Sequence, residues 1–142
     1  LVGWAAIKGG LDWPAVVLFF GAVLWTIGYD TIYAHQDRED DALLGLGSTA
    51  ISFGESSVSI VGGLYAAAVC CWLIAGALAG AHLIYFLAVT LAFLQMSWQV
   101  STLDINDPWN CLRRFRSNRD VGIAVFLGIV VDMLLSWFAG LN

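Results

Sequence analysis

The stretch that decides the fold is SSVSIVGGLYAAAVCCWLIAGALAGAHLIYFLAVTLAFLQMSWQVSTL, residues 56–103, which contains no Asp, Glu, Lys or Arg. At 1.5 Å per residue, two helical crossings of a hydrocarbon core about 30 Å thick need roughly 40 residues. The interval therefore predicts a helical hairpin in a bilayer rather than a single span. We expect spans at 58–75 and 83–100, joined by a tight turn at 76–81.

Two glycines of this interval have the spacing of a helix-packing motif. Gly76 and Gly80 lie four residues apart, as small residues do where two membrane helices approach closely. Both fall in the predicted turn, so we interpret them as loop residues rather than as a packing surface.

The whole chain has the composition of a membrane protein. Only 12% of its residues are charged, against about 25% in average soluble domains, and its mean hydropathy is +0.81. Further apolar runs at 15–29 and 121–139 predict two more spans, and 1–7 resembles the tail of a truncated one. We therefore predict an all-α, polytopic transmembrane helix bundle of about four spans plus a truncated N-terminal one. No basic patch interleaved with aromatic residues suggests a nucleic-acid partner.

The second informative stretch is DTIYAHQDREDD, residues 30–41, which holds five of the eleven acidic residues. If the preceding helix continues through it, Asp37 and Asp41 are one turn apart and Asp30 lies on the same side. Three carboxylates on one face repel each other unless a cation neutralises them, and only Arg38 offsets them here. The spacing favours a divalent metal site, with a solvated acidic helix end and other ion handling as alternatives.

The metal that suits this stretch is Mg²⁺ bound to a phosphate group. Mg²⁺ prefers six oxygen ligands and is usually held by one or two carboxylates, with water and substrate phosphates completing the shell. The sequence contains neither an EF-hand loop nor a Walker A loop. We therefore expect an open site that binds a diphosphate.

The basic residues predict the orientation of the chain. The acidic stretch and the polar stretch 101–119 are separated by two spans, so they should lie on the same side of the membrane. Together they carry five of the six basic residues, which places that side in the cytoplasm or the mitochondrial matrix. The cluster Arg113, Arg114, Arg116 and Arg119 could close over a diphosphate or simply set the topology.

The acidic stretch resembles the second aspartate-rich motif of the UbiA family of intramembrane aromatic prenyltransferases. The following Ser48–Gly54 and the stretch Cys111–Asn118 are similar to the same family, and most similar to its subgroup acting on 4-hydroxybenzoate in ubiquinone biosynthesis. The resemblance covers essentially all 142 residues. Because the family's first aspartate-rich motif is absent, we interpret residues 1–142 as the C-terminal half of a nine-helix UbiA-type domain.

This resemblance implies a site built from two aspartate-rich motifs that face each other across a central cavity. Each motif would hold Mg²⁺ against the diphosphate of a polyprenyl substrate. Carried over by position, Asp37 and Asp41 are the catalytic metal ligands. The residues assigned to substrate binding are Asp30, Tyr33, Arg38 and Asp40, with Arg38 as a charge partner of the acids.

The implied reaction is transfer of a polyprenyl group from polyprenyl diphosphate to the carbon ortho to the hydroxyl of 4-hydroxybenzoate. Its setting would be the lipid bilayer of a bacterial plasma membrane or a mitochondrial inner membrane. We expect the chain to need the N-terminal half of the same protein and to be inactive alone. The aromatic candidates for stabilising an allylic cation are Trp25, Tyr29 and Tyr33, although structural packing is the favoured interpretation for Trp25.

A competing hypothesis is a small membrane subunit that binds or conducts divalent cations. Asp132, in the middle of the last predicted span, has no assigned role, although a charge at that depth should face the bundle interior. His82, in the predicted turn, is expected to be exposed.

Overall fold

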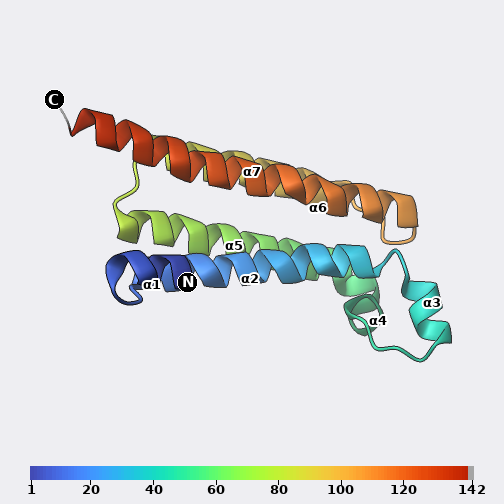
Figure 1. Cartoon of the computed structure of the whole chain (residues 1–142). Coiled ribbons are helices and arrows are strands. Elements are labelled where there is room, and N and C mark those ends of the chain that lie inside the picture. Colours follow the sequence, from blue (N-terminus) through green and yellow to red (C-terminus); the bar gives the residue numbers. More distant parts are fainter. Residues whose placement is uncertain (141–142) are drawn as a thin grey trace.

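The computed structural model describes residues 1–140, apart from the side chains of Glu39 and Asp40. In this part of the chain all regular structure is helical, and four helices are long and apolar enough to cross a membrane (Figure 1). They are α2 (Trp13–Ala34), α5 (Ser57–Ala79), α6 (Leu83–Ser101) and α7 (Pro108–Ala139). The shorter elements are α1 (Val2–Lys8), α3 (Arg38–Leu43), α4 (Thr49–Phe53) and a 3-10 turn at Gly54–Ser56. The four predicted spans are confirmed. Where the sequence predicted the tail of a truncated span, the structure has α1, a helix of seven residues.

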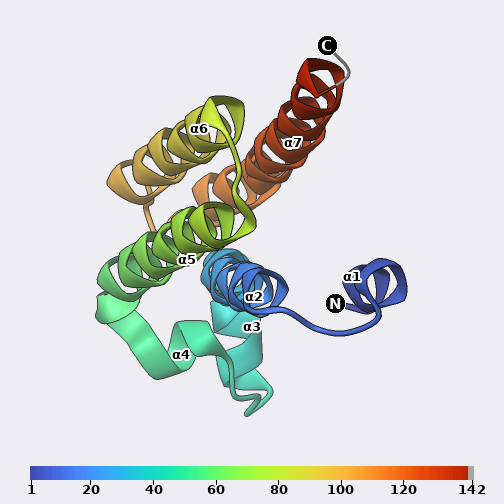
Figure 2. The same cartoon turned by 90° about the vertical axis from the view of Figure 1, so that its left-hand side faces the viewer.

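The four long helices run side by side. Helix α2 packs along α5, α6 packs along α7, and the two pairs meet where α5 contacts α6 and α2 contacts α7. Viewed along the helices, α5 lies between α2 and α6, and α1 lies apart from the bundle (Figure 2). The α5–α6 turn is at one end, and α3, α4 and the beginning of α7 are at the other (Figure 1).

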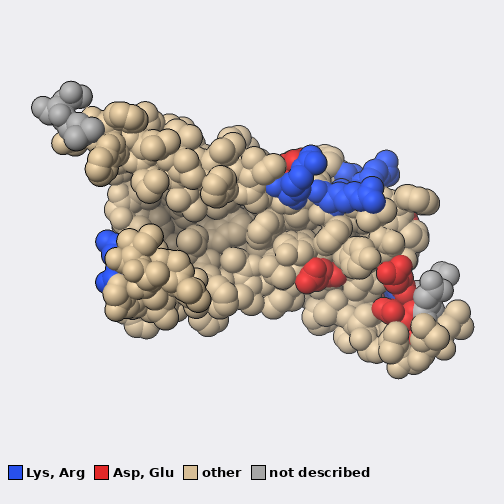
Figure 3. Space-filling view, in the orientation of Figure 1, with Lys and Arg blue, Asp and Glu red and all other residues tan. Residues whose placement is uncertain are grey.

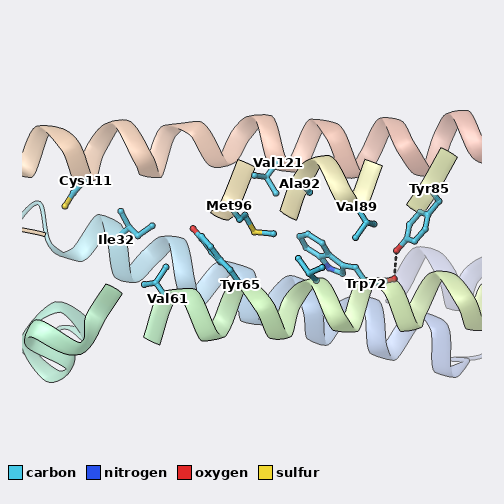
Figure 4. Packing of buried hydrophobic residues seen from close by; sticks show 11 residues of the cluster. Ile32, Val61, Tyr65, Trp72, Tyr85, Val89, Ala92, Met96, Cys111 and Val121 are labelled. Atoms are coloured by element: carbon cyan, nitrogen blue, oxygen red, sulfur yellow. Dashed lines mark hydrogen bonds between the residues drawn. The ribbon is translucent and has the colours of Figure 1, made fainter. Parts of the chain in front are cut away.

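The interior is filled by aromatic and aliphatic side chains from the four long helices. Tyr65 and Trp72 of α5 lie among Val89, Met96 and Val121 of α6 and α7 (Figure 4). Large apolar side chains also cover the outside, among them Phe20, Ile74, Leu91, Phe126 and Leu134. Such an outer surface suits contact with lipid, because helices satisfy their own backbone hydrogen bonds there.

Helix α5 is longer than predicted, and this changes the role of Gly76. The helix continues to Ala79 and ends at Gly80, which has the left-handed conformation (φ 70°) common at helix ends. Gly76 is buried within the helix, and a Cβ there would clash with the ring of Tyr85 on α6. The interpretation of Gly76 as a loop residue was therefore wrong. It lets α5 and α6 approach closely, and the Tyr85 hydroxyl donates to the Trp72 carbonyl at 2.7 Å (Figure 4).

The structure explains the aspartate in the last span. Asp132 is only 6% exposed, and its two carboxylate oxygens accept hydrogen bonds from the backbone N–H groups of His82 (2.8 Å) and Tyr85 (3.2 Å). These are orphan donors of the first turn of α6, so a side chain of α7 caps the neighbouring helix. His82 itself is exposed, as predicted.

His82, Ser136 and Asp132 do not form a catalytic relay. The Ser136 hydroxyl lies 2.9 Å from His82 Nδ1, and Asp132 Oδ2 lies 3.4 Å from the same nitrogen. A serine nucleophile needs its partner on the other ring nitrogen. The group is therefore a structural contact at the end of the bundle.

Helix α7 begins earlier than predicted. Asp107 caps it by accepting from the Trp109 N–H at 2.9 Å, and Pro108 occupies its first turn, where a missing N–H costs nothing. Only the short segment 102–107 is a loop. The arginines at 113–119 are therefore on a helix, which fixes the direction of each one.

Candidate functional site

Charged side chains gather at one end of the molecule. Figure 3 shows acidic and basic side chains gathered at the same end, where α2 leads into α3 and α7 begins. Lys8 is the last residue of α1, which lies at the opposite end (Figure 1). This confirms that the acidic stretch and the arginine-rich stretch share one side, as the sequence predicted. The site is therefore built where α2 ends and α7 begins.

The acidic stretch is not one continuous helix. Helix α2 ends at Ala34, and α3 begins at Arg38 and points away from the α2 axis (Figure 1). The prediction that Asp30 shares a helix face with Asp37 and Asp41 was therefore wrong. The buried His35 lies at the bend. The sequence has no Gly or Pro there that would have predicted a break in the helix.

Asp37 and Asp41 remain one turn apart after the bend. The Asp41 N–H donates to the Asp37 carbonyl at 2.9 Å, which places both residues on the α3 turn. Both side chains are half-buried, and Asp37 borders a hollow of about 260 Å³. The other residues lining this hollow are Gln36, Pro108, Trp109 and Leu112, so it lies between the bend and the first turns of α7.

The described side chains provide a pair of carboxylates here. Among the described residues, no three His, Cys, Asp or Glu side chains lie close enough together to hold a metal ion. Two carboxylates one turn apart suit Mg²⁺, which keeps positions for water and phosphate oxygens.

The residues assigned to substrate binding differ in their exposure and in their contacts. Asp30 is exposed on α2, and Tyr33 is half-exposed with its ring 4.8 Å from that of Phe115 on α7. Arg38 is half-buried and makes no ion pair within the described part of the chain, so its predicted pairing with the acids is not seen. The side chain of Asp40 lies outside the described residues.

The bend holds a histidine that the sequence did not single out. His35 is 3% exposed, and neither ring nitrogen has a hydrogen-bond partner among the described residues. Burial, and then the Arg38 guanidinium, lower the pKa of the imidazole below its ordinary value, against a smaller opposite effect of Glu55. Its surroundings therefore favour the neutral form of the imidazole.

A row of aromatic rings leads from the core to the acidic end. Trp25 lies 5.8 Å from Trp72 and 5.2 Å from Tyr29, and Tyr29 lies 5.8 Å from Phe115, measured between ring centroids. Phe115 in turn meets Tyr33. The row brings together the aromatic candidates of α2 and adds Phe115, whose contact could not be predicted without the packing of α7 on α2.

Asn118 ties this row to the bundle. Its Oδ1 accepts from Trp25 Nε1 at 2.8 Å and from the Tyr65 hydroxyl at 3.2 Å, so one amide joins α7 to α2 and α5. Its Nδ2 donates to the carbonyls of Arg114 (3.1 Å) and Phe115 (3.3 Å). The sequence placed Asn118 in a motif but did not reveal this role, because the three helices meet only in the folded bundle.

The arginines of α7 separate into two groups. Arg116 and Arg119 line a hollow of about 320 Å³, together with Trp25, Tyr29, Phe115, Asn118 and Gly122. Arg114 points to α6 instead, where its guanidinium lies 4.0 Å from the ring centroid of Trp98. Arg113 is exposed and is not among the residues lining this hollow.

The comparison with known proteins decides the family. The model of the UbiA prenyltransferase family matches residues 1–139. The chain belongs to this family. It is 46% identical to a protein of Rattus norvegicus, 44% to one of Homo sapiens and 43% to one of Bos taurus, each over 94% of this chain.

These UbiA relatives are all named "4-hydroxybenzoate polyprenyltransferase, mitochondrial". The chain spans 36% of the length of each and matches their C-terminal part. No solved structure matches the chain. The resemblance to the UbiA family, and the all-helical membrane fold that it implied, are thus confirmed.

Proposed function

We propose that this chain forms the α3 side of the active site of a prenyltransferase. The proposed reaction transfers a polyprenyl group from polyprenyl diphosphate to the carbon ortho to the hydroxyl of 4-hydroxybenzoate, in ubiquinone biosynthesis. UbiA membership and the names of relatives 43–46% identical support this proposal. The observation that carries it is the Asp37 and Asp41 pair at the end of an aromatic row.

Asp37 and Asp41 are the residues that would hold Mg²⁺. When bound, Mg²⁺ supplies charge neutralisation for the diphosphate and so assists its departure. The two carboxylates lie at the end of the bundle, which leaves room for phosphate oxygens and water. A partner acidic motif from the rest of the protein would complete the clamp.

The aromatic row suits the carbon side of the reaction. When the bond between the allylic carbon and the diphosphate oxygen breaks, the electron pair leaves with the diphosphate and the carbon becomes cationic. The faces of Tyr29, Tyr33 and Phe115 favour a nearby cation and exclude water that would capture it. The acceptor ring then forms the new carbon–carbon bond and loses a proton from the same ring carbon.

The surrounding membrane is part of the proposal. The arginine-rich end would face the matrix or the cytoplasm, because positive residues favour that side. The mitochondrial names of the relatives favour an inner mitochondrial membrane. The competing hypothesis, a subunit that binds or conducts divalent cations, has no support from the family match.

The test uses the full-length protein that contains this chain, purified and inserted into liposomes. We expect polyprenyl diphosphate and 4-hydroxybenzoate to give the ortho-prenylated acid and one diphosphate per turnover, followed by mass spectrometry. Excess EDTA should stop the reaction, and added Mg²⁺ should restore it. No product from the intact protein, or product formation unchanged by EDTA, would overturn the proposal.

A further inference from the structure

We propose that Arg114 and Trp98 bind the phosphate headgroup of an anionic phospholipid, at the end of the bundle where α6 ends and α7 begins. The acyl chain of this lipid lies along the exposed face of α6. The surface is on the outside of the bundle, and its role is independent of the proposed reaction. Three features support the assignment: a guanidinium held in place, the lack of a counter-charge beside it, and an apolar stripe that begins there.

The Arg114 guanidinium has a fixed position on the contact between α6 and α7. Its Cζ atom lies 4.0 Å from the ring centroid of Trp98, a distance typical of a cation–π pair. Three residues further along α7, the Ser117 hydroxyl accepts a hydrogen bond from Nε2 of the fully buried Gln99 at 3.0 Å. A guanidinium that is already held against a ring loses less conformational entropy when it binds a ligand.

Arg114 has no counter-charge within the described part of the chain. It makes no ion pair there, and its Nε is buried without a hydrogen-bond partner. Helix α6 contains no Asp or Glu. In the loop before α7, Asp104 and Asp107 each use a carboxylate oxygen to accept a backbone N–H, at 3.0 and 2.9 Å. The guanidinium therefore suits an anion from outside the chain, and phosphate oxygens match its planar set of donors.

An apolar stripe on α6 begins at Trp98. Leu94, Leu91 and Leu87 precede it at intervals of four, three and four residues, so all four side chains share one helix face. Each of them is exposed, by between 44% and 61%. The stripe is about 16 Å long at 1.5 Å per residue, close to half of a hydrocarbon core about 30 Å thick. A headgroup at Arg114 therefore places one acyl chain along the stripe within a single leaflet.

The direction of Arg114 separates it from the α3 carboxylates. The neighbouring Phe115 contacts Tyr29 and Tyr33 of α2, whereas Arg114 contacts α6. Helix α5 lies between α2 and α6 when the bundle is viewed along the helices (Figure 2). The arginine-rich end favours the side of the membrane whose leaflet carries anionic lipids. A lipid headgroup, rather than a diphosphate bound at α3, is therefore the anion suited to Arg114.

The first test measures how lipids stabilise the full-length protein, purified in an uncharged detergent. Phosphatidylglycerol or phosphatidylcholine with the same acyl chains is added in rising mole fraction, and thermal unfolding is followed by tryptophan fluorescence. Phosphatidylglycerol should raise the midpoint more than phosphatidylcholine, because a ligand that binds only the folded state stabilises it. Arg114→Gln should weaken the apparent affinity for phosphatidylglycerol about fivefold, since one arginine contact to an anionic lipid is lost. Arg114→Lys should fall between the two, because it keeps the charge but not the planar donors.

Arg119→Gln is the matched control, because it removes the same charge from the same helix. Arg119 already lies 3.1 Å from Asp120, and an exposed, paired charge contributes little, so the affinity should stay within about twofold of wild type. Equal losses in the Arg114 and Arg119 variants would indicate general attraction between charges and overturn the site. A midpoint of Arg114→Gln that falls equally with both lipids and in detergent alone would assign Arg114 to a partner elsewhere in the protein, and would also overturn it.

A second measurement locates the acyl chain and leaves Arg114 unchanged. The protein and its Trp98→Phe variant are inserted into liposomes that contain either phosphatidylglycerol or phosphatidylcholine with brominated acyl chains, which quench nearby tryptophan. The difference between the two proteins gives the emission of Trp98. We expect brominated phosphatidylglycerol to quench it more strongly than brominated phosphatidylcholine at the same mole fraction. Equal quenching by the two lipids would contradict the site, whatever the outcome for prenyl transfer.

Discussion

Asn118 joins three helices through a single amide group. Its side chain is 5% exposed and connects Trp25 of α2 and Tyr65 of α5 to α7. A buried amide that satisfies two donors at once is hard to replace, because each donor left without a partner costs free energy. At the scale of the single residue, the geometry of the aromatic row depends on this contact.

We predict that Asn118→Ala lowers the free energy of unfolding of the full-length protein by roughly 2–4 kcal/mol, since the buried Tyr65 hydroxyl and the partly buried Trp25 Nε1 lose their acceptor. Thermal unfolding in detergent, followed by tryptophan fluorescence, measures the change. Asn106→Ala is the control, because Asn106 is exposed in the loop before α7. Equal midpoints for the Asn118 and Asn106 variants would show that the amide does not hold the bundle.

The helices illustrate which structural features a sequence reveals. The spans were predictable because an apolar run of about 20 residues is a long and redundant signal. The bend at His35 was not, since no Gly or Pro marks it and the helical pattern of α2 continues to Tyr33. Consequently the spacing of Asp37 and Asp41 was predicted correctly, whereas the position of Asp30 was not.

The first turns of α7 also contain features that the sequence predicted only in part. Asp107 and Pro108 form a helix-start signal, but the polar residues that follow them suggested a loop. Only the helical phase separates Arg116, which lines the hollow, from Arg114, which packs on Trp98. The charge of the arginine cluster could be predicted from the sequence, but the role of each member could not.

At the scale of the element, the approach of α5 and α6 depends on Gly76. We predict that Gly76→Ala lowers the free energy of unfolding by about 1–3 kcal/mol, because the added methyl group clashes with the buried ring of Tyr85. Gly63→Ala, on the same helix, has open space around it and should be neutral or slightly stabilising. Thermal unfolding midpoints measure both, and a similar effect of the two substitutions would contradict the packing role of Gly76.

At the scale of the whole molecule, the two ends of the bundle differ in their side chains. The α5–α6 turn, capped by Asp132, closes one end, while the acidic pair and the arginines of α7 occupy the other. The long helices between them expose apolar side chains to lipid. This arrangement places Asp37 and Asp41, which we propose to bind the diphosphate, at one end of the bundle, and the aromatic row from Tyr29 to Trp72 leads from there to the apolar interior.

The UbiA relatives are nearly three times as long as the stretch that they share with this chain. The resemblance assigns the family's first aspartate-rich motif to the part that they have in addition. In this account the Asp37 and Asp41 pair is one side of a clamp, and activity is a property of the complete protein. If the proposed function is correct, we expect both sides to be essential, because one acidic motif would leave part of the diphosphate charge unneutralised.

The most direct measurement is the rate of prenyl transfer by the full-length protein with Asp37→Ala or Asp41→Ala, at increasing Mg²⁺. Both variants should lose at least about a hundredfold in turnover, because the group that supports the leaving diphosphate is no longer held. Asp12→Ala, an exposed carboxylate where the chain enters α2, should keep wild-type activity. Near wild-type turnover in both α3 variants would contradict the account.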